Sequence, residues 1–216
     1  MICKNGFLFD SPCMKRMFDL LFATVLWLIL LPLSLIISLL ISATMPGPVF
    51  FRQVRIGYKG QPFTIIKFRT MKINQSDISI TLKSDDRITA LGRWLRRTKL
   101  DELPQLLNVI KGHMSFVGPR PDVPGYSDKL TGDDQLIWSV RPGITGIDSV
   151  NYFCEEDILS SVHDPLEYYN EVLWPAKVRL NVWYVNQQNF CLDMKIMINT
   201  LFLLIFNKQC FSIKTT

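Results

Sequence analysis

The chain has 216 residues and a mass of 25.0 kDa, with 48% hydrophobic and 20% charged residues. This composition excludes a disordered, collagen-like or disulfide-dense protein. The net charge of +5 is unevenly spread, because residues 52–141 carry 16 basic and 9 acidic side chains. Such a basic section predicts an anionic partner, either nucleic acid, anionic lipid headgroups or a phosphorylated small molecule.

A long apolar segment, Leu20–Thr44, stands near the N-terminus. As a helix rising about 1.5 Å per residue it would reach about 37 Å, more than a hydrocarbon core of about 30 Å. Pro32 lies at its middle and should bend the helix. Positive charge, which prefers the cytoplasmic side, flanks both ends. The sequence leaves two topologies open: a bent helix that enters and leaves one leaflet, and an ordinary kinked span.

Two short strands are expected next, at Val49–Val54 and Pro62–Phe68. The turn-forming residues 57–60 separate them, so the pair should form a hairpin. Residues 72–85 are polar and are expected to form a loop.

Two helices should follow this loop. Asp85 or Asp86 is placed to cap the first, whose apolar face carries Ile88, Leu91 and Leu95. The second begins within residues 98–104 and stops at Gly112.

The C-terminal half combines one short strand with helices. Met114–Val117 is the strand, and Asp164–Asn186 is a helix that restarts near Pro175. Phe190–Phe206 is apolar on most sides, so it is either a core helix or a segment that lies against the bilayer.

These elements predict an α+β fold in three parts. Residues 1–48 form the N-terminal segment and membrane helix, and residues 49–189 form a small, mostly helical catalytic domain with short strands. Residues 190–216 form an apolar segment, either membrane-associated or packed on the domain.

Adjacent carboxylates, Asp101 and Glu102, stand at the start of the second helix, just after several cations. The helix dipole and these cations should keep both ionised, which suits a nucleophile or metal ligand. The alternative is a capping box formed by Thr98 and Asp101.

Two proline-flanked arginines are candidates for phosphate binding. Arg120 lies between two prolines, so a stiff turn would fix the direction of its guanidinium. Arg141-Pro142-Gly143 repeats this design. Lys67 and Arg69 alternate along a strand and should therefore share one face. A solvated surface arginine is the alternative for either turn.

Together these motifs resemble the bacterial sugar transferase family, the monotopic polyprenyl-phosphate glycosyl-1-phosphate transferases. The match covers nearly the whole chain, from Lys15 to about Phe206, and the short length is similar to that of the minimal members. It rests on the stretches KFRTM (67–71), LDELPQ (100–105), NVIKGHMSFVGPRP (108–121) and RPGITG (141–146).

The resemblance implies a UDP-sugar donor, undecaprenyl phosphate as acceptor and Mg²⁺ as cofactor. Asp101 matches the family's nucleophile and Glu102 its metal-binding neighbour, with Asp101 a second candidate ligand. The positions linked with phosphate handling are Lys67, Arg96, Arg120 and Arg141, to which we add Arg69 from the same strand face.

The family's membrane helix is re-entrant and breaks at a Ser-Pro pair, which here is Leu31-Pro32. The resemblance therefore implies a monotopic protein of the bacterial inner membrane with its catalytic domain on the cytoplasmic face; a homodimer is an open alternative. The chain departs from the family pattern at Leu31, which stands in place of the Ser before Pro32, at His113, after Gly146 (Ile147–Asn151) and at Asn181. The last two departures could alter the choice of donor.

A competing hypothesis is a non-catalytic, membrane-anchored scaffold whose basic face binds anionic lipids. It predicts that Asp101 and Glu102 are dispensable. A nucleic-acid partner is not expected, because aromatic residues do not alternate with the basic cluster as stacking platforms would require.

Overall fold

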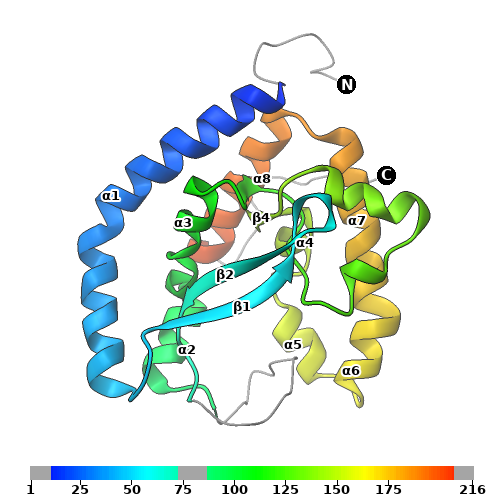
Figure 1. Cartoon of the computed structure of the whole chain (residues 1–216). Helices are drawn as coiled ribbons and strands as arrows, with labels where there is room; N and C mark the ends of the chain where they lie inside the picture. The colour runs from blue at the N-terminus through cyan, green and yellow to red at the C-terminus, as the bar shows by residue number, and fades with distance from the viewer. Residues whose placement is uncertain (1–10, 73–86, 207–216) are drawn as a thin grey trace.

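The computed structural model describes residues 11–72 and 87–206 (Figure 1). Its first element is the helix α1, Pro12–Thr44, which begins eight residues before the apolar segment. Ser11 caps this helix by accepting a hydrogen bond from the backbone of Met14, and Pro12 occupies the first turn, where its missing N–H costs little. Among the described residues, α1 is the one helix long and apolar enough to cross a membrane.

The helix α1 is bent rather than straight (Figure 1). Pro32 lies inside it and cannot donate the intrahelical hydrogen bond to the turn before, which accounts for a bend in its middle part. The expected break at Pro32 is therefore present as a bend within one continuous helix.

The predicted hairpin is confirmed. Strand β1, Phe50–Ile56, pairs antiparallel with β2, Pro62–Phe68, in a register that sets Phe50 opposite Phe68. The short 3₁₀ turn η2, Tyr58–Gly60, connects them. The polar stretch after β2 falls mostly on residues 73–86, outside the described residues.

The two helices expected next are present with different starts. Thr89 caps α2, Ala90–Arg97, by accepting from the backbone of Gly92 at 2.9 Å. The predicted caps, Asp85 and Asp86, lie outside the described residues. The second helix is split into a 3₁₀ turn, η3 (Leu100–Glu102), and α3 (Gln105–Ile110).

A parallel strand pair follows, of which only one strand was predicted. Strand β3, Ser115–Val117, pairs with β4, Gly143–Thr145. Glycine permits the close approach after β3, because a Cβ on Gly118 would lie 2.3 Å from the carbonyl oxygen of Arg141. The turns before Arg120 and after Arg141 are thereby held against each other.

The remaining chain is helical. Asp164 caps α6, Pro165–Tyr168. A π-helical turn, η6 (Tyr169–Leu173), then leads into α7, Trp174–Gln187, so a new helical segment begins near Pro175 as predicted. The last helix, α8, spans Phe190–Phe206. Four shorter helices were not predicted: η4 (Ser127–Lys129), η5 (Gly132–Ser139), α4 (Ile147–Asn151) and α5 (Glu155–Ser160).

The main core joins the two ends of the chain. Ala23 of α1, Val109 of α3 and Ile196 of α8 are fully buried in one apolar cluster. A second cluster packs Ile37 and Ile41 of α1 on Leu95 of α2. The helix α8 packs one face into the core, whereas Leu201, Phe202, Ile205 and Phe206 are exposed.

The two ends of α1 are bound to the same domain. At its start, Arg16 donates to the backbone carbonyls of Val109 and Ile110, at 2.7 and 3.1 Å. At its end, Arg69, which directly follows β2, donates to the carbonyls of Met45 and Pro46, at 2.6 and 2.9 Å. The bent helix thus runs along one side of the molecule with both termini fixed to the domain (Figure 1).

Candidate active site

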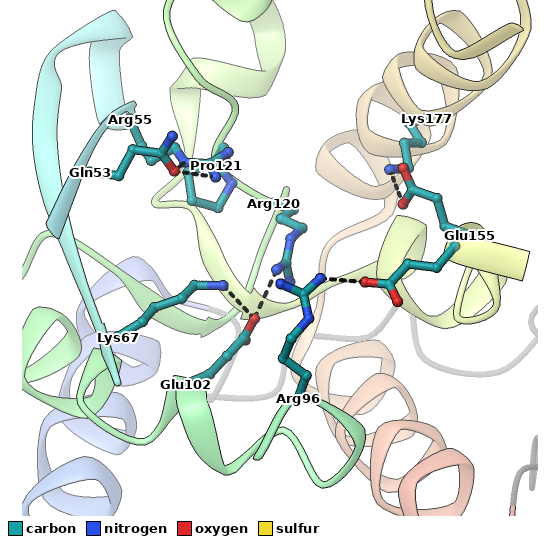
Figure 2. Close-up of polar contacts among 10 residues, drawn as sticks. Gln53, Arg55, Lys67, Arg96, Glu102, Arg120, Pro121, Glu155 and Lys177 are labelled. Carbon is teal, nitrogen blue, oxygen red and sulfur yellow. Dashed lines mark hydrogen bonds and ion pairs between the residues drawn. The ribbon is translucent and has the colours of Figure 1, made fainter. Parts of the chain in front are cut away.

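A buried carboxylate with two cations forms the centre of the site. Glu102 Oε1 accepts from Lys67 Nζ at 2.7 Å and from Arg120 Nη2 at 2.8 Å, and the residue is 8% exposed. The three side chains come from separate elements: Lys67 from β2, Glu102 from η3 and Arg120 from the turn after β3 (Figure 2). Folding therefore brings together residues that are 35 and 18 positions apart in the sequence.

Asp101 lies beside this cluster without a hydrogen-bond partner. Its Oδ1 atom is buried and no described residue donates to it, although the residue is only 8% exposed. The predicted capping box is not formed, because the Thr98 hydroxyl donates to the carbonyls of Trp94 and Leu95 at the end of α2. A buried polar atom left unpaired in this way is a mark of a functional site.

The pKa values of the two carboxyl groups are shifted in opposite directions. Burial alone would raise the pKa of Glu102, but the charges of Arg120 and Lys67 hold it well below the ordinary value. Burial, and then the charge of Glu102, raise the pKa of Asp101, with Lys67 opposing. The helix start therefore does not lower the pKa of Asp101, because η3 is a three-residue 3₁₀ turn with little dipole and the site is desolvated.

Arg120 is held in place by backbone pairing as well as by its prolines. The Gly118 N–H donates to the carbonyl of Thr145, and the Gly143 N–H donates to that of Pro119, both at 3.0 Å. The charge of Glu102 raises the pKa of Arg120 above its ordinary value. The rigid presentation expected from Pro119-Arg120-Pro121 is therefore present, directed at Glu102.

Arg96 borders the site from α2. Its Nη2 donates to Glu156 Oε1 at 2.5 Å, an exposed side chain, and its charge lowers the pKa of Asp101. Because this ion pair is partly solvated, it contributes little stability and can exchange for another anion.

Arg69 and Arg141 lie elsewhere. Arg69 is 5% exposed and binds the carbonyls that end α1, so its guanidinium does not meet Lys67 as the strand alternation predicted. Arg141 Nε donates to the carbonyl of Gly112 at 2.9 Å and its guanidinium lies over the ring of Tyr58. Since Gly112 follows the C-terminal end of α3, Arg141 sits at the end of that helix opposite to Glu102.

Asp101 and Glu102 fit a magnesium ion that also binds phosphate. Mg²⁺ usually takes one or two carboxylates and completes its shell with water and substrate phosphates. The unpaired Asp101 Oδ1 is an available oxygen of this kind. A group of three or more His, Cys, Asp or Glu side chains, as an all-protein metal site would use, is absent from the described residues.

A cavity of about 140 Å³ opens next to Arg120. Its wall is built by β1, the 119–122 turn, η5, α4 and α7, and it contains Asp148 and Asn181. Sequence reasoning had singled out these two positions only as departures from a pattern. The folded chain places them in one pocket beside the carboxylate cluster.

Comparison with known proteins identifies the family of the chain. The model of the bacterial sugar transferase family matches residues 10–207. A UDP-glucose:undecaprenyl-phosphate glucose-1-phosphate transferase of Klebsiella pneumoniae is 35% identical over 94% of this chain and 44% of its own length. The uncharacterized sugar transferase EpsL of Bacillus subtilis is 38% identical, over 85% of this chain and 83% of its own.

An exopolysaccharide production protein, PSS, of Rhizobium leguminosarum is 36% identical over 87% of this chain and 92% of its own length. The chain thus spans less than half of the Klebsiella relative but most of the other two. With a family model that covers nearly all of its residues and relatives of this identity, the chain belongs to the bacterial sugar transferase family.

Proposed function

We propose that the protein transfers a sugar-1-phosphate from a UDP-sugar to undecaprenyl phosphate, as the first membrane step of surface glycan assembly. The observation that carries this is the buried Lys67–Glu102–Arg120 cluster beside the unpaired carboxylate of Asp101. Relatives whose names state this chemistry support it, including the Klebsiella and Escherichia coli glucose-1-phosphate transferases.

Asp101 is the nucleophile in this proposal. Its carboxylate oxygen attacks the β-phosphorus of the donor, the bond to the bridging oxygen breaks, and UMP leaves with the electron pair. A phosphate oxygen of the lipid then attacks the same phosphorus, and the bond to Asp101 breaks to regenerate the carboxylate. A covalent intermediate suits a site that receives one substrate from water and the other from the membrane.

Glu102, with Asp101 as a second candidate, would hold Mg²⁺. A bound magnesium ion lowers the repulsion between an anionic nucleophile and the donor diphosphate. Lys67, fixed on Glu102, adds a positive charge at the base of the site. Arg120 presents a planar guanidinium suited to bidentate phosphate binding, and Arg96 can release Glu156 to bind a transferring oxygen.

The two fixed ends of α1 support a proposal for the membrane arrangement. A helix that crosses the bilayer puts its ends on opposite sides, about 30 Å or more apart across hydrocarbon. Here the Arg16 and Arg69 contacts join both ends to one domain with polar surface. We therefore propose a re-entrant, monotopic helix in the bacterial inner membrane, bent at Pro32, with the catalytic domain on the cytoplasmic face.

Incubation of the purified protein with labelled UDP-sugar, Mg²⁺ and no lipid tests the mechanism. We expect stoichiometric UMP release and a sugar-phosphate adduct that maps to Asp101. Asp101→Asn should form no adduct and show no turnover, while it folds and binds membranes as the parent does. Turnover without an adduct, and with kinetics that need both substrates bound together, would replace the two-step route with direct transfer.

The same variants test the scaffold hypothesis. A lipid-binding scaffold would keep its membrane binding and its cellular role in Asp101→Asn and Glu102→Gln. For a transferase we expect both variants to lose UMP release with every UDP-sugar in a panel.

A further inference from the structure

The cavity next to Arg120 contains an unusual share of unpaired polar atoms. Eight buried side-chain nitrogen or oxygen atoms among the described residues have no hydrogen-bond partner. Four of them belong to residues that line this one cavity: Asp148, Asn181, Ser127 and Trp138. Since buried polar groups are nearly always paired in folded proteins, this concentration indicates a site built for a polar ligand.

Two of these four groups are hydrogen-bond acceptors. Asp148 is 3% exposed and Asn181 is 6% exposed, and in each the unpaired atom is Oδ1. A carboxylate oxygen and an amide oxygen call for O–H or N–H donors. Trp138 Nε1 and the Ser127 hydroxyl are unpaired donors that can bind oxygens of the same ligand.

Aromatic rings complete the wall of the cavity. Trp138, Tyr169 and Trp174 line it and offer apolar surface beside the polar groups. Lys177 and Glu155, also in the wall, pair with each other at 2.6 Å, so their charges are largely balanced (Figure 2). The ligand that fits is a neutral ring with several hydroxyl groups and some apolar surface.

The cavity is continuous with the catalytic cluster through one residue. Arg120 lines the cavity and at the same time donates to Glu102. A ligand whose ring occupies the cavity would therefore place an attached phosphate at Arg120.

We propose that this cavity is the subsite for the sugar ring of the donor, and that Asp148 and Asn181 are specificity-determining residues that accept hydrogen bonds from its hydroxyl groups. This inference rests on the proposed function. The nucleoside is the weaker candidate, because uracil offers a single N–H donor and ribose two hydroxyls, whereas a hexose ring carries more hydroxyl donors than either. A site built to bind a hydroxyl group rejects analogues that lack it, so these two residues select the sugar.

Binding measurements in detergent test this directly. Isothermal titration would compare UMP, UDP and a panel of UDP-hexoses and UDP-N-acetylhexosamines on the parent protein, on Asp148→Asn and on Asn181→Leu. We expect the preferred UDP-sugar to bind about 10-fold or more weakly to each variant. The Kd of UMP and of UDP should change less than about 2-fold.

Asp134→Asn, which makes the same chemical change at an exposed position of η5, is the matched control and should bind every ligand as the parent does. Monodeoxy analogues of the preferred UDP-sugar give a second measurement on the unaltered protein, independent of whether a variant folds. At least one analogue should bind about 10-fold more weakly to the parent.

Each outcome has one meaning. Equal weakening of UMP and UDP-sugar in the Asp148 and Asn181 variants would assign the cavity to the nucleoside and overturn the proposal. Unchanged binding of all ligands, or deoxy analogues that all bind like the parent sugar, would also overturn it. The protein could instead bind the UDP-sugar selectively through Asp148 but release no UMP in the presence of any polyprenyl phosphate. That result would refute the proposed function and leave the sugar subsite standing.

Discussion

Asp122 should make the protein less stable as the pH rises through the acidic range. Burial, and then the charge of Asp148, raise the pKa of Asp122 from 3.8 to about 6, against the opposing effects of Trp174 and Lys177. In the unfolded chain this carboxyl ionises near its ordinary value. Between these two values the folded state binds the proton more tightly, so the free energy of unfolding falls as the pH rises from about 4 to about 6.

The size of the effect follows from the pKa. One pKa unit corresponds to about 1.4 kcal/mol, so a pKa raised to about 6 represents about 3 kcal/mol of stability. That stability is fully present below pH 4 and is lost at neutral pH. Asp122→Asn removes the ionisation while it keeps the size and an acceptor for Trp174, whose Nε1 lies 3.5 Å from Asp122 Oδ2.

The assay is chemical denaturation in detergent at several pH values between 4 and 8, for both proteins. Other buried carboxyls titrate in both, so the difference between the two curves isolates Asp122. We expect Asp122→Asn to gain up to about 3 kcal/mol over the parent at pH 7.5, and to lose this advantage near pH 4. Asp134→Asn, at an exposed position, should follow the parent. Parallel curves for Asp122→Asn and the parent would refute the reasoning.

Three further predictions follow from the geometry. Arg120→Lys should lower kcat/KM for UMP release about 100-fold, because an ammonium group does not replace a planar guanidinium fixed by two prolines. Arg52→Lys, at an exposed position of β1, is the control. Near-parental turnover in Arg120→Lys would mean that the turn has only a structural role. Gly92→Ala should lower the free energy of unfolding by about 2 kcal/mol or more, measured by chemical denaturation, because its Cβ would lie 1.9 Å from the carbonyl oxygen of Thr70. An unchanged free energy of unfolding would show that α2 can shift to make room. Cys13 and Cys154 are both exposed on the protein surface, so in the proposed topology an impermeant thiol reagent added to intact cells should label neither of them. Pro32→Leu should make some Cys13 reactive, because a straighter helix can span the bilayer. Ready labelling of Cys13 in the parent would mean a spanning helix.

The elements with strong local signals were predictable. The bend at Pro32 and the β1–β2 hairpin follow from a proline in an apolar run and from a turn between two strands. The parallel pair β3–β4 was half missed, because three-residue strands carry no periodicity and their pairing depends on the contact between Gly118 and Gly143. The cap of α2 is Thr89, which directly precedes the helix. The sequence alone did not identify it, because several nearby polar residues could also have served as the cap.

The site was predictable in residue type but only partly in position. Lys67, Glu102 and Arg120 were all predicted as residues of one phosphate-handling site, and their side chains are in contact in the structure. The direction of a long side chain depends on which carbonyls or carboxylates lie within reach, and the sequence does not state this. Arg69 and Arg141 accordingly bind backbone carbonyls near the ends of α1 and α3, although strand alternation had suggested a site role for Arg69 and a proline-flanked turn like that of Arg120 had suggested one for Arg141.

The excess positive charge of residues 52–141 therefore has two uses. Arg69 and Arg141 bind carbonyls of residues just past the ends of α1 and α3, and this is a structural role. Lys67 and Arg120 share one carboxylate, so with Asp101 and Glu102 the four groups at the centre carry no net charge if both acids are ionised. A diphosphate that enters this neutral site needs further cations. Arg96, whose partner Glu156 is exposed, and a divalent ion on the unpaired oxygen of Asp101 are the groups that can supply them.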